Sequence, residues 1–223
     1  MRYCLQPGDT PLFGAERGCD EFEQRILQFS DAGEPQVNAD DDELLYVLSG
    51  VGAATVGDTH TELAPGTAAF VPRGTPWRVE GGDGLEILSV LVRRPLPAEG
   101  HAVFDLAASE ADSATAGRMF RLLANPDAGC PSVTQFVGYI PIGRAPDHFH
   151  TYDEVVYVLE GEGALHIDGE TARLTAGTSV HLPARLVHCL ENVGPGEMQV
   201  LGVFRPAGSP AEAYYPDGTR AQY

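Results

Sequence analysis

Lysine is absent from this 223-residue chain, and all 14 of its basic residues are arginine. Against 32 acidic residues they leave a formal net charge of −18. Without lysine the chain has no P-loop lysine for a nucleotide phosphate and no amine for a Schiff base with a carbonyl substrate or pyridoxal phosphate. A surface this acidic repels phosphate backbones and anionic lipids, so we expect no nucleic-acid partner and no membrane partner.

Cysteine and long apolar runs are also scarce. The cysteines stand at positions 4, 19, 130 and 189 with no Cys-x-x-Cys pair, which predicts reduced thiols rather than a disulfide framework. The opening residues, MRYCLQPGDTP, lack the apolar segment of a secretory signal peptide. No stretch approaches the roughly 18 consecutive apolar residues of a membrane span. We therefore expect a cytoplasmic protein.

The chain contains one unit twice. A shift of 111 residues aligns DELLYVLSGVGA, residues 42–53, with DEVVYVLEGEGA, residues 153–164, without a gap. A constant register of this kind indicates a tandem duplication. We expect an N-terminal domain over residues 1–100, a linker over 101–119 and a C-terminal domain over 120–223.

The two repeats have the pattern of short β-strands. Runs such as YVLSG and GTAAFVP combine β-branched and aromatic residues and end at glycine or proline. The expected linker, rich in alanine, serine and acidic residues, is the one stretch that tolerates one or two helical turns. Many short strands with tight turns favour a fold that closes its sheet edges. We predict an all-β chain with two tandem jelly-roll β-barrels.

Four residues of the second repeat have the chemistry of a metal site: His148, His150, Glu154 and His188. Histidines two apart on a strand face the same side, and Glu154 is near enough in sequence to return to them across a bend. Three imidazoles and a carboxylate suit iron, manganese, nickel, copper or zinc, with positions left for water or substrate. The alternative, a pair of solvated loop histidines, leaves the convergence of three of the seven histidines unexplained.

These residues also carry a family resemblance. The pattern G-x4-H-x-H-x3-E-x6-G that begins at Gly143 resembles the first cupin motif, and G-x5-P-x4-H-x3-N from Gly177 resembles the second. The gap before the first histidine is one residue short of the commonest form, and Arg185 stands where glycine is usual. With its degenerate first copy, the chain resembles a small bicupin over residues 20–206. The resemblance implies two cupin-type barrels and one divalent transition metal (Fe, Mn, Ni or Zn) in the C-terminal one.

The first repeat lacks this ligand set. The same shift places Val37, Ala39 and Trp77 where the second repeat has its three histidines, and retains only the carboxylate as Glu43. One carboxylate does not hold a transition metal, and the tryptophan has the bulk to fill the vacated barrel. We expect a structural role for the N-terminal domain, with a second pocket for an organic ligand as the alternative.

Three further features have an ordinary structural interpretation beside a functional one. His181 corresponds to Phe70, which favours a buried interface position over catalysis. Gln24 and Gln135 recur in both copies, which favours a structural hydrogen bond over a substrate contact. Arg144 has the chemistry to bind a substrate carboxylate but is typical of a solvated loop charge.

The resemblance implies a metal-dependent enzyme that acts on a small organic molecule. Among cupin activities we favour a mononuclear-metal dioxygenase in which Glu154 is both ligand and catalytic proton acceptor. One alternative is a metal-dependent isomerase, lyase or decarboxylase, and another is a non-enzymatic binding or sensing bicupin. Two barrels in one chain are compatible with a monomer or a homodimer.

Overall fold

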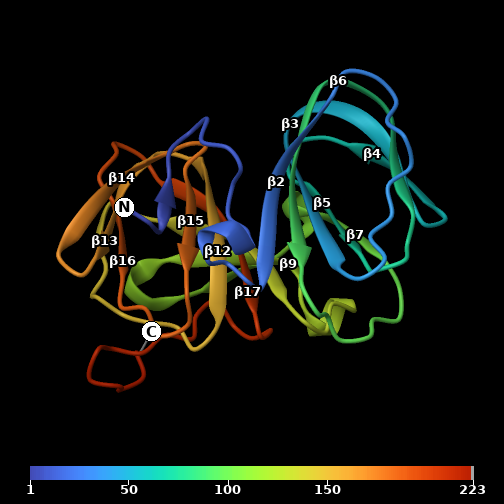
Figure 1. Ribbon diagram of the computed structural model, residues 1–223. Helices are drawn as coiled ribbons and strands as arrows, with labels where there is room; N and C mark the ends of the chain where they lie inside the picture. Colours follow the sequence, from blue (N-terminus) through green and yellow to red (C-terminus); the bar gives the residue numbers. More distant parts are fainter. Residues whose placement is uncertain (222–223) are drawn as a thin grey trace. The chain divides into compact units, whose positions relative to one another are not determined.

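The computed structural model describes residues 1–221 and consists mainly of β-strands, with four short 3-10 turns (Figure 1). It divides into two compact units. The N-terminal unit comprises Gly14–Ser109 and Leu123–Ser132, and the C-terminal unit comprises Met1–Phe13, Glu110–Leu122 and the chain from Val133 onward. The prediction of an all-β chain with two barrel units is confirmed.

One six-stranded sheet forms the N-terminal unit, in the order β2-β6-β3-β5-β7 with β4 paired to β3. These strands are β2 (Phe22–Phe29), β3 (Asp42–Val56), β4 (Thr59–Leu63), β5 (Thr67–Val71), β6 (Trp77–Val92) and β7 (Ala102–Asp105). The long strands β3 and β6 change register several times, and such bulges bend a sheet. The curved sheet encloses a core that includes Leu45, Trp77 and Ile87.

Two sheets form the C-terminal unit. One has the order β1-β15-β12-β17-β10-β9-β8 and the other β11-β16-β13-β14. The first contains β1 (Cys4–Leu5), β8 (Ala111–Ser113), β9 (Met119–Ala124), β10 (Thr134–Ile140), β12 (Asp153–Glu160), β15 (Ser179–Leu182) and β17 (Met198–Arg205). The second contains β11 (Gly143–Arg144), β13 (Glu162–Ile167), β14 (Glu170–Thr175) and β16 (Cys189–Asn192). Their facing side chains share a core that includes Val156, Leu165 and Met198.

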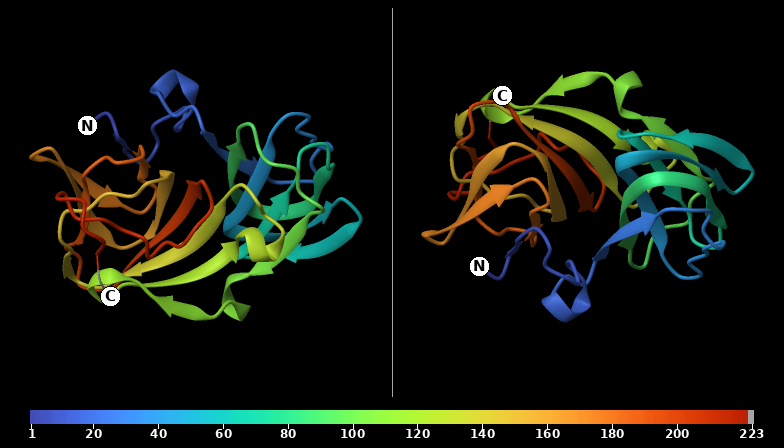
Figure 2. Two further views of the ribbon diagram at one scale, coloured as in Figure 1. Left: turned by 90° about the horizontal axis from the view of Figure 1, so that it is seen from below. Right: turned by 90° about the horizontal axis from the view of Figure 1, so that it is seen from above.

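Two segments extend these sheets in a way that the repeat did not predict. The first residues of the chain pair with β15 as β1, so they belong to the C-terminal unit (Figure 2). The expected linker, 101–119, holds β7, which pairs with β5, and β8, which pairs with β9. Its helical content is limited to the 3-10 turns Leu106–Ala108 and Thr115–Gly117. Each half of the segment therefore adds an edge strand to a different unit.

The structure also bears on the unusual Arg185, on the cysteines and on membrane spans. Arg185 has a φ of 67°, in the left-handed region that favours glycine, which accounts for the glycine usual at this position of the motif. All four cysteines lie among the described residues, are buried and form no disulfide. Within residues 1–221, no helix has the length and apolar character that crossing a membrane requires.

Candidate metal centre

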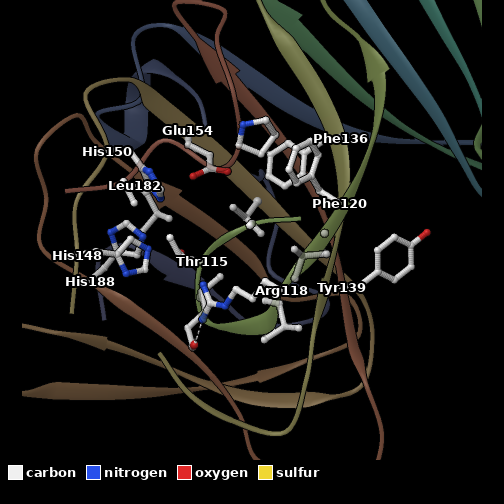
Figure 3. A pocket seen from close by; sticks show the side chains of 18 of the residues that line it. Thr115, Arg118, Phe120, Phe136, Tyr139, His148, His150, Glu154, Leu182 and His188 are labelled. Atoms are coloured by element: carbon white, nitrogen blue, oxygen red, sulfur yellow. Dashed lines mark hydrogen bonds between the residues drawn. The ribbon is translucent and has the colours of Figure 1, made fainter. Parts of the chain in front are cut away.

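Three histidines of the C-terminal unit converge at one point (Figure 3). His148 and His188 face each other in an isolated antiparallel bridge, with N–O distances of 3.0 and 2.8 Å. His150 follows two residues after His148, so its side chain returns to the same side of the chain. One ring nitrogen from each histidine lies within 4.8 Å of the other two. The structure thus brings together all three histidines that the sequence singled out.

Backbone carbonyls orient all three rings. Each Nδ1 lies at hydrogen-bond distance from a carbonyl oxygen: 2.9 Å for His148 to Pro146, 2.7 Å for His150 to Glu212 and 2.9 Å for His188 to Leu186. A carbonyl oxygen only accepts, so each Nδ1 is the protonated donor. The lone pair of each neutral ring is then on Nε2 and free for a metal, while the other ring N–H is hydrogen-bonded, as is usual for metal-binding histidines.

Burial keeps these imidazoles uncharged. It lowers the pKa of His150 to about 3, assisted by the nearby His148, and it lowers the pKa of His148 as well. The pKa of His188 lies well below its ordinary value for the same reason, with both other histidines contributing. Neutral imidazoles do not have to release a proton before they bind a cation. The cluster is therefore ready for a metal at neutral pH.

Glu154, the fourth predicted ligand, lines the same pocket but is not in the group of three. The group whose ligand atoms all lie within 4.8 Å of one another consists of the histidines alone. Oε1 of Glu154 instead approaches Gly202, where an added Cβ would lie 2.9 Å from it. Burial raises the pKa of Glu154 to about 8, although the nearby Arg118 opposes the rise. Its carboxyl group is thus suited to exchange a proton near neutral pH.

A cavity of about 70 Å³ opens beside the histidines. Since one water molecule needs roughly 10–15 Å³ of cavity volume, the cavity has room for several waters or a small organic molecule. Its walls are mostly apolar and include Phe120, Phe136, Ile140, Val156, Leu182, Leu190 and Val200. Besides the histidines and Glu154, the polar groups on its walls include Thr115 and Arg118 (Figure 3). Tyr152 also lines the cavity.

Comparison with known families decides the identity of the fold. The cupin-domain family model matches residues 26–92 and residues 135–204, one match in each unit. The chain belongs to the cupin family. The three histidines lie within its second cupin domain.

Individual relatives of this cupin match over part of their length. An uncharacterized protein of Aquifex aeolicus is 31% identical over 78 residues, which are 34% of this chain and 63% of that protein. The matches to four curated relatives cover from 40% to 63% of each relative's length.

Solved structures match over more of the chain. Protein YlbA from E. coli has a TM-score of 0.73 at 15% identity and covers 87% of this chain and 80% of its own. Oxalate decarboxylase of Bacillus subtilis, which has Mn(II) centres, has a TM-score of 0.71 at 14% identity and covers 87% of this chain and 72% of its own. At these identities the likeness shows the cupin fold alone.

In the first cupin domain, Glu43 is bound by protein donors. Its carboxylate accepts hydrogen bonds from Arg25 at 2.8 Å, Asn38 at 2.6 Å, Trp77 at 2.9 Å and Ser89 at 2.5 Å. Trp77 is buried in the core, as its bulk predicted. The apolar cavity near it measures about 20 Å³, which leaves little room for an organic ligand. Among its described residues, this unit contains no three-ligand group of its own.

The other residues singled out in the sequence, His181, Arg144 and Gln135, do not line the cavity beside the three histidines. His181 is buried and lies 2.9 Å from a carboxylate oxygen of Asp153, with the ring of Phe13 at 5.5 Å. Arg144 is exposed and paired with Asp147 at 3.0 Å, as its ordinary interpretation predicted, but it lies in the short strand β11 rather than in a loop. The prediction of a side-chain hydrogen bond for Gln135 is wrong, because neither polar atom of its buried amide has a partner among residues 1–221.

The sequence analysis did not identify three residues that lie close to the three histidines or line their cavity. Tyr152 stacks on His150 at a centroid distance of 4.7 Å and an angle of 8°, and its place two residues after His150 is the signal that points to it. Glu212 orients His150 from the C-terminal tail, through a carbonyl that no side-chain pattern reveals. Arg118 comes from the segment expected to be a linker.

Proposed function

We propose that the C-terminal cupin domain binds one divalent transition metal, iron, manganese, nickel or zinc, through His148, His150 and His188. The observation that carries this proposal is that the Nδ1 atom of each ring is held by a carbonyl while one ring nitrogen of each histidine lies within 4.8 Å of the other two. A first-row ion on three imidazoles keeps open positions for water or substrate. Glu154 joins as a fourth ligand only if its side chain turns away from Gly202.

We further propose that the protein is an enzyme for a small organic substrate, and that the reaction is a dioxygenation. A metal of this kind supplies a site where an organic anion and O2 can meet. The apolar walls exclude water from the substrate, and Glu154, with a pKa raised to about 8, holds or takes up the substrate's proton. Glu154 is therefore the proposed catalytic residue.

A second reaction class is favoured by the same carboxyl group. In the metal-free protein the raised pKa keeps Glu154 largely protonated at neutral pH, and an acid in this position can deliver a proton to a carbanion left by loss of CO2. Oxalate decarboxylase is also among the proteins with this fold. A decarboxylase, or a related isomerase or lyase, is the runner-up, and non-enzymatic ligand sensing is a third outcome.

Metal analysis tests the first proposal. The purified wild-type chain, His148→Ala and His166→Ala are dialysed against each of the four metals and their metal content is measured. His166 is a matched control because it lies in the same unit, outside the pocket, and contacts Glu191 at 2.7 Å. We expect one ion per chain in the wild type and in His166→Ala, and none in His148→Ala. Full metal content in His148→Ala would contradict the site.

Turnover separates the reaction classes. Oxygen uptake and CO2 release are followed with each metal over a panel of phenols, diketones and hydroxy acids. Oxygen uptake that is lost in His148→Ala supports the dioxygenase. CO2 release or isomerisation without oxygen uptake supports the runner-up. Saturable ligand binding without turnover across the panel would refute both and favour a sensing module.

A further inference from the structure

Arg118 reaches into the metal pocket from outside the strands that carry the histidines. It lies between the 3-10 turn Thr115–Gly117 and β9, in the segment that precedes the second cupin domain. The turn is tight, with φ values of 59° at Ala116 and 70° at Gly117, and the backbone N–H of Ala114 donates to the carbonyl of Arg118 at 2.8 Å. Figure 3 shows the side chain entering beside Thr115 on the side of the histidines.

The guanidinium has no carboxylate to neutralise it. Among residues 1–221, no carboxylate oxygen forms an ion pair with Arg118 within 4.0 Å. Within the described part of the chain, the guanidinium forms one hydrogen bond, from Nη2 to the carbonyl oxygen of Leu190 at 2.5 Å. A guanidinium has five N–H donors, so most of them remain for another acceptor.

Arg118 is partly buried, and no carboxylate among the described residues pairs with its charge. Burial lowers the pKa of Arg118, yet a guanidinium stays protonated in proteins. A desolvated cation is stabilised by an anion that forms charge-assisted hydrogen bonds with it. Glu154 lies beyond ion-pair distance of the guanidinium, and its pKa, raised to about 8, keeps this carboxyl largely protonated at neutral pH. We therefore expect a bound ligand to supply the anion that pairs with the Arg118 guanidinium.

We propose that Arg118 binds the carboxylate of an organic acid, which is the substrate class of this pocket. The proposal rests on the function proposed above, because the acid occupies the cavity beside the three histidines. The apolar part of the acid lies against the rings of Phe120 and Phe136, which meet edge to face at 6.4 Å. The carbonyl of Leu190 keeps the guanidinium in place, and the flat fork of donors matches the two oxygens of a carboxylate.

Matched pairs of acids and amides test this assignment without turnover. Pyruvate, benzoate and phenylacetate are titrated calorimetrically into the full-length protein as isolated, beside pyruvamide, benzamide and phenylacetamide. The variants are Arg118→Gln, Arg118→Lys and, as a control, Arg144→Gln, which removes an exposed arginine of the same unit. Metal content and circular dichroism are recorded for each protein.

We expect at least one acid to bind about 10–100-fold more tightly than its amide, the range for a hydrogen bond to a charged group. Arg118→Gln should lose this preference, Arg118→Lys should recover part of it, and Arg144→Gln should keep it, all with unchanged metal content. Equal affinity for acids and amides in the wild type would overturn the proposal, as would full acid affinity in Arg118→Gln. Acid binding lost only together with the metal in both Arg118 variants would assign the residue a structural role and overturn it too.

The two proposals fail in different ways. Acid binding that depends on Arg118, combined with no turnover on any substrate, would refute the enzyme and leave the anion site intact. Turnover on neutral substrates with no dependence on Arg118 would support the enzyme and refute the anion site.

Discussion

Replacing Glu43 by alanine is expected to destabilise the N-terminal cupin unit by about 3–5 kcal/mol, the usual range for removing one partner of a buried charged pair. The carboxylate is fully buried and accepts four hydrogen bonds. Two of its donors, Trp77 and Ser89, are themselves buried and would be left unsatisfied, at about 1–3 kcal/mol each. Arg25 contributes less, because a third of its side chain is exposed and can be solvated by water.

Urea unfolding monitored by tryptophan fluorescence measures this loss of stability. Trp77 is the only tryptophan in the chain and donates directly to Glu43, so its emission reports the affected unit. Glu99→Ala, which removes an exposed glutamate, is the matched control and should change stability by less than about 0.5 kcal/mol. A loss below about 1 kcal/mol in Glu43→Ala would refute the view that this buried network stabilises the unit.

Three further changes test the C-terminal unit. Ending the chain at Ser209 removes the carbonyl that orients His150, so we expect the metal dissociation constant to rise about 10–100-fold in competition with a chelating dye. Glu154→Gln should stabilise the metal-free protein increasingly from pH 4.5 to pH 8 in urea unfolding. Between these pH values the Glu154 carboxyl, with its pKa raised to about 8 in the folded state, keeps a proton that it loses in the unfolded state. The free energy of unfolding of the wild type therefore falls as pH rises, whereas Glu154→Gln lacks this loss. A stability difference between the two proteins that does not vary with pH would contradict this. Gly202→Ala places a Cβ 2.3 Å from Cε1 of Phe136, and we expect a thermal destabilisation of about 1–3 kcal/mol that Gly196→Ala, with open space around its Cβ, does not show.

The sequence was sufficient to predict that the three histidines converge, and the reason is local geometry. Spacing of two residues puts His148 and His150 on one side of the chain, and the repeat identifies the strand region that brings His188 to them. Likewise, substitution of a histidine position by Trp77 was enough to predict a filled barrel core in the first copy.

Other parts of the site depend on contacts between distant segments, which a one-dimensional pattern does not contain. The carbonyl of Glu212 reaches His150 across 62 positions of sequence, and a backbone atom leaves no signature in residue type. Arg118 lies in a stretch whose alanine, serine and acidic residues resemble a linker, although it forms an edge strand and a pocket wall. The direction of Glu154 depends on the space that Gly202 leaves on the neighbouring strand.

The most direct test of the account is anomalous X-ray scattering from crystals of the metal-loaded protein, collected at the absorption edge of the bound metal. The account predicts one peak per chain, about 2.0–2.2 Å from Nε2 of His148, His150 and His188, and no peak in the N-terminal cupin unit. The same map shows whether Glu154 has turned to the ion or remains beside Gly202. A metal held elsewhere in the chain, or a peak that contacts fewer than three of these histidines, would contradict the central claim.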